Sequence, residues 1–504
     1  MSNTIEKLKP FINGKYVESK SGKYMDVFDP STGDVIAQTP CCTAEEVEAA
    51  IAAAQAAYPS WSNTPCAKRV EVLYRFRDLL IEHMDELTYL LCRENGKNWS
   101  EAKGDLLKVK EPVEVACGAP SLMMGESLMN VTEGFDSTLY RESLGVFVGI
   151  APFNFPGMIP MGWMMPMCIA TGNTLVLKAS SMTPMTSLRL VGLLQEAGLP
   201  DGVVNIVTCS RQEAELFLTH PDVKGVTLVG STSVGKHIYA TAAANGKRVQ
   251  ALCEAKNHAL VLEDAPIQRT VAGILNSSFG CAGERCMALS VVCVQESIAD
   301  RLVEEILKQI KSKKIGPAYD KTTDLGPVVT AGHKKFVTDW IAKGVEEGAQ
   351  LILDGRNTVV PGYENGFYVG HTVFDHITPE MTIGQSEIFG PVLCIKRVRD
   401  FEEGLALMNA NPFANGSVIF TQNGYYAREF AKRTHGGMVG VNVGIPVPAG
   451  MFPFAGHKNS FFGDLHALGK DGMRFYTESK VVTTRWFNED EMKNTKVSTW
   501  DGAI

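Results

Sequence analysis

The sequence lacks the features of a membrane-embedded or exported protein. Its most apolar stretch, residues 158–170, is shorter than the ~20 residues that a spanning helix needs, and Pro160, Gly162 and Pro166 interrupt it. The first ten residues mix charged and single apolar side chains, without the continuous apolar core of a secretory signal. We therefore predict a cytoplasmic protein with no membrane partner.

Positive charge is not in excess either. The 504 residues include 48 Lys and Arg against 56 Asp and Glu, and the formal net charge of -8 is spread along the chain. A nucleic-acid-binding surface would need a cluster of basic residues, so we predict no nucleic-acid partner. A hydrophobic content of 45% is ordinary for a globular protein, and small molecules are the expected partners.

Several catalytic and metal-binding motifs are also missing. The twelve cysteines include no C-x-x-C pair, which argues against zinc ribbons and favours free thiols in a reducing compartment. The sequence contains neither H-E-x-x-H nor G-x-S-x-G, and its ten histidines are scattered, so we assign no metal site and no serine hydrolase site. No G-x-G spacing occurs, so the usual dinucleotide fingerprint is absent.

What is present is the rhythm of an α/β protein. The first hundred residues are mainly helical in pattern, with a capping box at 43–46 and a long amphipathic pattern over 70–94. Short apolar runs then alternate with helical patterns, which is typical of parallel sheets with crossover helices. We predict two open α/β lobes that meet near 255–275, with strands at 145–151, 174–178, 203–208, 226–230, 259–262, 290–294, 350–353, 392–398 and 417–420.

A glycine-bearing run follows the fourth predicted strand. The segment Gly230-Ser-Thr-Ser-Val-Gly235-Lys236 matches a phosphate-binding loop up to His237, which stands where a Ser or Thr would bind magnesium. Two other interpretations stay open: a plain glycine turn between a strand and a helix, or a helix start whose free N–H groups face an anion.

The sharpest chemical signal is the run Phe279-Gly-Cys-Ala-Gly-Glu-Arg-Cys286-Met. It presents Cys286 on a glycine-bearing turn next to Arg285, and a cation and backbone N–H groups can lower a thiol pKa and so favour the nucleophilic thiolate. Cys281 lies close enough in sequence to compete for this role.

Two further segments carry polar groups at rigid positions. In Ala151-Pro-Phe-Asn-Phe-Pro156, two prolines flank Asn154, whose amide could donate to a developing oxyanion or simply stabilise a turn. In Glu387-Ile-Phe-Gly-Pro391, the Glu387 carboxylate could accept from ribose hydroxyls or could be a surface group before a turn.

Together these segments resemble the aldehyde dehydrogenase superfamily, in the family's order and over nearly the whole chain. The resemblance implies Cys286 as nucleophile, Asn154 as oxyanion ligand and Glu387 as ligand of the nicotinamide ribose. It also implies a dinucleotide site that includes Phe153, Lys178, Ser181, Gly230, Ser231, Gly235 and Phe389. The superfamily binds its dinucleotide without the usual fingerprint, which agrees with the absence noted above.

The implied organisation follows the family's fold. We predict a dinucleotide-binding domain from 1–130 and 144–255, a catalytic domain over 256–440, and a substrate-pocket loop region over 441–472. Residues 131–143 and 473–490 would form an oligomerisation element, in a homodimer or homotetramer.

Within the superfamily, the chain is most similar to the CoA-acylating methylmalonate-semialdehyde dehydrogenase branch. The runs that carry this similarity are Ala151–Gly157, Ala255-Lys-Asn-His258, Gly283-Glu-Arg-Cys-Met-Ala288 and Ser460-Phe-Phe-Gly-Asp-Leu-His466. Hydrolytic members carry a general-base Glu where this chain has Leu252, so the acyl-enzyme thioester should wait for CoA. Glu254 stands where the family usually has Gly and could activate water by another route.

Two departures concern the ligands. Ser181 replaces a Glu common in NAD-preferring members, so NAD is expected but NADP stays open. Lys108 stands where the branch has a basic residue expected to be Arg, and Lys108 and Arg285 are the candidates for binding a substrate anion. Malonate or methylmalonate semialdehyde is the expected substrate, with decarboxylation, and a sulfonated or other anionic aldehyde is the alternative.

The expected reaction is therefore dinucleotide-dependent, CoA-acylating oxidation of an aldehyde. Two alternatives stay open: hydrolytic oxidation to a free acid, and a nucleotide-binding protein that keeps the fold without the chemistry. The chain's response to CoA and the reactivity of Cys286 separate these alternatives.

Overall fold

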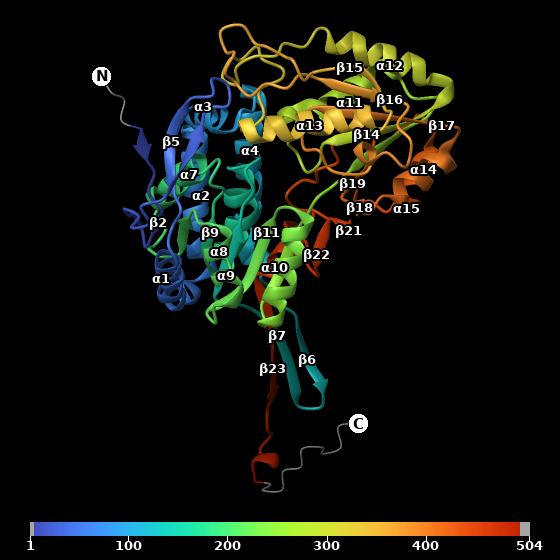
Figure 1. Ribbon diagram of the computed structural model, residues 1–504. Coiled ribbons are helices and arrows are strands. Elements are labelled where there is room, and N and C mark those ends of the chain that lie inside the picture. Colours follow the sequence, from blue (N-terminus) through green and yellow to red (C-terminus); the bar gives the residue numbers. More distant parts are fainter. Residues whose placement is uncertain (1–4, 494–504) are drawn as a thin grey trace.

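A computed structural model describes residues 5–493 and consists of two α/β lobes with a slender arm extending from the first (Figure 1). Each lobe is built on its own mainly parallel sheet, and the arm is a separate three-stranded sheet. The predicted fold class, two open α/β lobes with a small additional hairpin, is confirmed. Residues 1–4 of the predicted 1–130 segment lie outside the described residues.

The first lobe contains an eight-stranded sheet. Its strand order is β22 (Phe461–Gly463), β12 (Arg248–Leu252), β11 (Val223–Val229), β8 (Val146–Ile150), β9 (Thr174–Lys178), β10 (Val204–Val207), β2 (Phe11–Ile12) and β3 (Lys15–Tyr16). The five central strands are parallel. Helices α1 (Ala44–Asn63), α7 (Met185–Glu196) and α10 (Thr232–Ala244) pack against these strands; α8 (Arg211–Ala214) and α9 (Leu216–Thr219) are single turns.

The N-terminal helices begin with the predicted capping box. Thr43 Oγ1 accepts from the Glu46 N–H, and the Glu46 carboxylate accepts from the Thr43 N–H, as the sequence predicts. The pattern over residues 70–94 was predicted as one element, but it is two helices, α2 (Cys66–Glu82) and α3 (Met84–Asn95). The backbone leaves helical geometry at His83, while the apolar spacing continues across the break and hides it.

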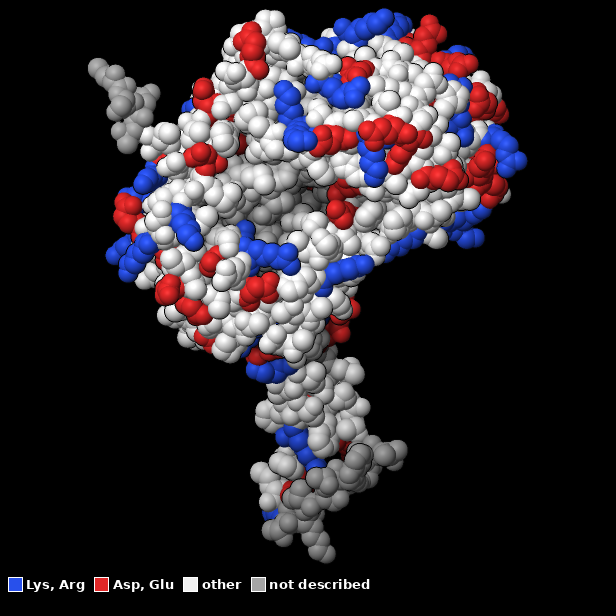
Figure 2. Space-filling model, viewed as in Figure 1, with Lys and Arg blue, Asp and Glu red and all other residues white. Residues whose placement is uncertain are grey.

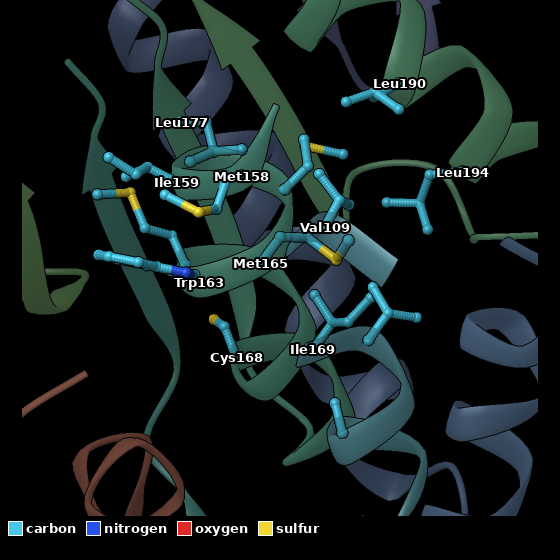
Figure 3. Close-up of a cluster of buried hydrophobic side chains, with 14 of the residues drawn as sticks. Val109, Met158, Ile159, Trp163, Met165, Cys168, Ile169, Leu177, Leu190 and Leu194 are labelled. Carbon is cyan, nitrogen blue, oxygen red and sulfur yellow. The ribbon is translucent and has the colours of Figure 1, made fainter. Parts of the chain in front are cut away.

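The apolar stretch over residues 158–170 lies in the core of the first lobe. It forms a π-helix, η1 (Met158–Met164), followed by α6 (Met165–Ala170), and it packs on α4 (Trp99–Cys117). Figure 3 shows Met158, Trp163 and Ile169 from this segment among buried side chains such as Val109 of α4. No helix within residues 5–493 has the length and hydropathy to cross a membrane.

The second lobe contains a seven-stranded sheet. Its order is β15 (Gln350–Leu353), β16 (Thr372–Asp375), β17 (Val392–Val398), β14 (Leu289–Gln295), β13 (Asn257–Val261), β19 (Gly416–Phe420) and β20 (Met438–Val441). Its helices are α11 (Ile267–Phe279), α12 (Glu296–Ile310), α13 (Ala331–Glu346), α14 (Phe401–Ala410) and α15 (Gly424–Arg433). The predicted boundary at 255/256 falls between β12 and β13, which belong to different sheets.

A small three-stranded sheet, one strand pair and several short helices complete the described part of the fold. Strands β1 (Glu6–Lys7), β4 (Tyr24–Phe28) and β5 (Val35–Pro40) form a three-stranded sheet, and β18 (Phe413–Ala414) pairs with β21 (His457–Lys458). The short helices are α5 (Ala119–Leu122), α16 (Gly469–Phe475) and the 3-10 turns η2 (Gly280–Gly283), η3 (Thr382–Gly384) and η4 (Glu491–Lys493).

The arm is a sheet in which β7 (Phe135–Ser143) lies between β6 (Ser127–Thr132) and β23 (Thr477–Arg485). The sequence pattern predicted a strand over 473–486, but α16 occupies its first residues and the strand begins at Thr477. Figure 1 shows the arm projecting away from both lobes. It carries the exposed apolar side chains Leu128, Met129, Val481 and Trp486.

Candidate functional site

The two large sheets present opposite ends to the space between the lobes. In the first sheet, β8 and β11 are neighbours. The chain continues from β8 to β9 on one side of this pair and from β11 to β12 on the other side, so the strand order reverses between β8 and β11. Ligands of open α/β sheets bind at such a reversal, outside the carboxyl ends of the strands. From the second lobe, Cys286 and Phe389 lie just before the amino ends of β14 and β17.

A cavity of about 540 Å³ lies at this reversal, and the face drawn in Figure 2 is hollowed between the two lobes. The cavity is lined by nine of the residues predicted from the sequence: Phe153, Asn154, Lys178, Ser181, Gly230, Ser231, Cys286, Glu387 and Phe389. The predicted Gly235 does not line the cavity. A Cβ at Gly235 would lie 2.2 Å from Cys253 Sγ, so this glycine permits close packing of α10 on the end of β12.

A second cavity, of about 390 Å³, contains both predicted anion-binding residues, Lys108 and Arg285. Apolar side chains including Phe155, Trp163 and Phe454 form much of its wall. Among residues 5–493, Cys286 is the only one that lines both of these cavities. A group bound in either cavity can therefore reach the same sulfur.

The backbone around Cys286 is fixed by strain and by hydrogen bonds. Cys281 and Ala282 both have φ of 52°, in the left-handed region that non-glycine residues rarely adopt. The Cys286 carbonyl accepts from Asn257 Nδ2 at 2.9 Å and from Asn415 Nδ2 at 3.3 Å. Strain of this kind persists only where the surroundings over-determine the conformation, and it clusters at functional sites.

The electrostatics of the Cys286 thiol differ from the prediction. Burial, with a smaller contribution from the nearby Glu387 carboxylate, raises the pKa of Cys286 to about 12. Arg285 was expected to favour the thiolate, but it lowers the pKa of this thiol by less than burial raises it. The guanidinium instead donates from Nε to Cys281 Sγ at 3.1 Å and pairs with Glu101 at 3.3 Å.

Asn154 is buried at the end of the loop that follows β8. Its Nδ2 donates to the Glu284 carbonyl at 2.9 Å, and its Oδ1 has no hydrogen-bond partner among residues 5–493. Because an amide nitrogen carries two hydrogens, one donor remains for an oxyanion in the cavity. Lys97, which the sequence reasoning missed, donates to the Asn154 carbonyl and pairs with Asp105 at 2.8 Å.

Glu387 and Phe389 are held by contacts from both sides of the cleft. The Glu387 carboxylate accepts from the Ala255 N–H at 3.2 Å, and burial, with Glu254 nearby, raises the pKa of Glu387 to about 8. Phe389 has φ of 59°, and its ring packs against Phe153 with centroids 5.8 Å apart.

His333 is a further residue that sequence reasoning missed. Its Nε2 lies 2.7 Å from the Phe389 carbonyl and its ring lies 5.9 Å from that of Phe153. It comes from α13, and no local motif marks it, so only the tertiary structure could reveal its role.

The structure decides between the readings of the run from 230 to 236. Helix α10 begins at Thr232, so Lys236 lies within the helix rather than in a loop ahead of it, and its Nζ lies 5.6 Å from the Phe462 ring. His237 pairs with Glu215 at 2.7 Å. The phosphate-loop interpretation is therefore wrong. The run is a glycine turn into a helix, and its first two residues, Gly230 and Ser231, line the cavity.

Each predicted anion-binding cation already has a carboxylate partner. Arg285 pairs with Glu101, and Lys108 pairs with Glu111 at 2.5 Å. A substrate anion would thus enter a balanced set of charges and compete with these carboxylates. Within residues 5–493, no group of three or more His, Cys, Asp and Glu side chains is arranged to hold a metal ion, and the twelve cysteines are free thiols.

Comparison with known sequences assigns this geometry to one family. A model of the aldehyde dehydrogenase family matches residues 16–482. Malonate-semialdehyde dehydrogenase 1 of Oceanobacillus iheyensis is 46% identical over 487 residues, which are 97% of this chain and 100% of the relative. Malonate-semialdehyde dehydrogenase 1 of Geobacillus thermodenitrificans is 48% identical over 486 residues, 96% of this chain and 100% of the relative.

Solved structures similar to this chain belong to the same family. A putative methylmalonate-semialdehyde dehydrogenase from Sinorhizobium meliloti, complexed with NAD, has a TM-score of 0.95 and 41% identity, with 97% of this chain and 99% of that chain covered. Methylmalonate-semialdehyde dehydrogenase from Oceanimonas doudoroffii has a TM-score of 0.94 and 45% identity, with 96% and 99% covered. The predicted family resemblance and fold are confirmed.

Proposed function

The chain belongs to the aldehyde dehydrogenase family, and from that premise we propose that it oxidises malonate or methylmalonate semialdehyde to an acyl-CoA, with NAD as the hydride acceptor. The observation that carries this proposal is the position of Cys286 on both cavities. One cavity has lining residues that suit a dinucleotide, and the other has two cations and apolar walls for a short anionic aldehyde. The names of the relatives described above support the substrate class.

The residues of the larger cavity fit a dinucleotide. Lys178 ends β9 and offers an ammonium to ribose hydroxyls, the start of α10 offers N–H groups to a pyrophosphate, and Glu387 offers a carboxylate to the second ribose. Ser181 brings no negative charge against a 2′-phosphate, so NADP is the alternative to NAD. When bound, the nicotinamide supplies the hydride acceptor.

The first half-reaction uses Cys286 and Asn154. The Cys286 thiolate attacks the aldehyde carbon and forms a hemithioacetal oxyanion, which the free Asn154 amide hydrogen and the Cys286 N–H stabilise. Collapse of that oxyanion would pass the hydride from the aldehyde carbon to the dinucleotide held in the larger cavity, and it leaves an acyl thioester on Cys286. Because burial raises the pKa of this thiol, its proton passes to solvent before the attack.

The second half-reaction depends on what can attack the thioester. Leu252 is buried and occupies the position of the hydrolytic base, so no side chain there can take a proton from water. The CoA thiolate attacks the thioester carbon, acyl-CoA leaves and the Cys286 thiolate is restored. For malonate semialdehyde, loss of carbon dioxide balances the reaction as semialdehyde, NAD and CoA going to acetyl-CoA, carbon dioxide and NADH.

The test is steady-state NADH formation from malonate semialdehyde with and without CoA. We expect turnover with CoA, and without it a burst of about one NADH per active site followed by a rate at least roughly tenfold lower. Cys286→Ala should remove the burst, whereas Cys281→Ala should keep it. Equal steady-state rates with and without CoA would contradict the acylating assignment.

Hydrolytic oxidation is the second candidate, because Glu254 lines the same cavity as Cys286. If Glu254 activates water, Glu254→Gln should abolish CoA-independent turnover while the NADH burst remains. A rate that Glu254→Gln leaves unchanged would exclude this route.

We also propose that the arm assembles copies of this chain into a homodimer or homotetramer. Strand β6 is an edge of its sheet, and it exposes Leu128 and Met129 to 63% and 80%. An exposed edge with apolar side chains is a ready surface for pairing with another chain.

A further inference from the structure

Glu254 lies in the larger cavity, beside the start of α10. It sits between the end of β12 and the start of β13. Its carboxylate Oε2 accepts from the N–H of Thr232, the first residue of α10, at 3.2 Å. The Glu254 carboxylate thus binds the positive end of the helix.

The residue that precedes α10, Ser231, also lines the cavity. Ser231 is the N-cap residue, yet its side chain makes no capping hydrogen bond, and its Oγ lies 3.3 Å from Ser233 Oγ. The first-turn N–H groups of a helix have no partners within the helix, and its dipole favours a negative group there. Glu254 is held at that position by the same interactions that would hold a phosphate.

The contacts of Glu254 do not match those of a water-activating base. Its hydrogen bond is to the helix, and its charge acts on Glu387, whose pKa it helps to raise to about 8. The carboxylate that raises the pKa of Cys286 is Glu387. Glu254 is therefore directed toward the phosphate end of the cavity rather than toward the thiol.

We propose that Glu254 is an internal competitor for the dinucleotide pyrophosphate: its carboxylate binds the start of α10 in the free enzyme, leaves when the dinucleotide binds, and returns when it departs. This inference rests on the proposed dinucleotide site. The competition weakens binding of oxidised and reduced dinucleotide alike. In an acylating cycle, the competition also speeds the departure of NADH before CoA attacks the thioester. Glu254 is therefore a positioning residue for the release of NADH.

The experiment is an equilibrium titration without aldehyde or CoA, so its outcome does not depend on the acyl acceptor. NADH binding is followed by its fluorescence, and ADP-ribose and adenosine are titrated as competitors. ADP-ribose carries the pyrophosphate, whereas adenosine does not. The variants are Glu254→Gln, Glu254→Gly and Glu254→Asp, with Glu82→Gln on the exposed end of α2 as a control for the lost charge.

We expect Glu254→Gln and Glu254→Gly to bind NADH and ADP-ribose roughly tenfold more tightly, because each loses the competing charge. Their affinity for adenosine should be unchanged, Glu254→Asp should lie near the unmodified enzyme, and Glu82→Gln should match it. Stopped-flow measurement should show slower NADH release from Glu254→Gln.

Two results would overturn the inference. The first is unchanged NADH affinity in both Glu254→Gln and Glu254→Gly, and the second is tighter binding of adenosine to the same degree as ADP-ribose. Loss of turnover in Glu254→Gln with unaltered NADH affinity would assign Glu254 to water activation instead. A failure of NADH to bind the unmodified enzyme would refute the proposed dinucleotide site. NADH binding that the Glu254 substitutions leave unchanged would refute only the competition.

Discussion

The Lys97 ammonium lies 2.8 Å from the Asp105 carboxylate, with both side chains buried, and it also donates to the backbone carbonyl of Asn154. Asp105 in turn accepts from the Met158 N–H at 2.6 Å, at the start of η1. One ion pair thus fixes both the loop that carries Asn154 and the core helix that follows it.

Breaking this pair should cost both stability and activity. We expect Lys97→Met to lower the free energy of unfolding by about 3–5 kcal/mol, because Asp105 is left as an unpaired buried charge. Urea denaturation measures the loss, and kcat should fall as the Asn154 loop loosens. Lys103→Met, which removes an exposed cation from α4, the helix that carries Asp105, should change stability by less than about 1 kcal/mol. Equal effects of the two substitutions would contradict a special role for Lys97.

The pKa values of Cys286 and Glu387 predict how the free enzyme reacts with iodoacetamide. Since burial raises the pKa of Cys286 to about 12, the thiolate fraction should grow with pH, and alkylation of Cys286 should keep accelerating up to pH 10. Alkylation that levels off near neutral pH would show that the thiol is already ionised.

Glu387 provides a second test of the same site. Its pKa of about 8 means that its charge appears mainly above pH 8, and that charge disfavours the thiolate. Glu387→Gln should therefore speed alkylation of Cys286 at pH 9 and have little effect at pH 6.5, as measured by mass spectrometry of the labelled peptide. Faster alkylation to the same degree at both pH values would contradict this electrostatic coupling.

Substrate selectivity should follow the cations of the smaller cavity. We expect Arg285→Gln to raise KM for malonate semialdehyde by roughly 10- to 100-fold and to affect the uncharged aldehyde propanal far less, because a charged hydrogen bond is lost. Glu101→Gln should lower KM for the anionic substrate, since it removes the carboxylate that now pairs with Arg285. If both aldehydes respond equally to Arg285→Gln, the guanidinium does not bind the substrate anion.

The arm should determine assembly. The double substitution Leu128→Asp and Val481→Asp places charge on exposed apolar positions of β6 and β23, and it should reduce the mass measured by analytical ultracentrifugation. Tyr425→Asp, at an exposed aromatic residue on the second lobe, is the matched control and should leave the mass unchanged. A double variant with unaltered mass would exclude the arm as the assembly surface.

Much of the fold was predictable because its signals are local. The capping box at Thr43 needs only four residues, and the buried strands are recognisable as short apolar runs between helical patterns. The break at His83 was not predictable, because the apolar face continues through it. The strand after α16 was placed too early for a similar reason, since alternation alone does not distinguish a short helix from the start of a strand.

The candidate site likewise has features that local sequence predicts and features that only the fold shows. The sequence by itself determined the chemical groups, Cys286, Asn154 and Glu387, because their motifs are contiguous and lie at turns next to apolar strands. Only the tertiary structure decided that Arg285 turns to Glu101, that Lys97 and His333 hold the site from other elements, and that Glu254 binds the start of α10. Partners far apart in the chain leave no periodic or motif signal, because burial and charge pairing depend on which segments the fold brings together.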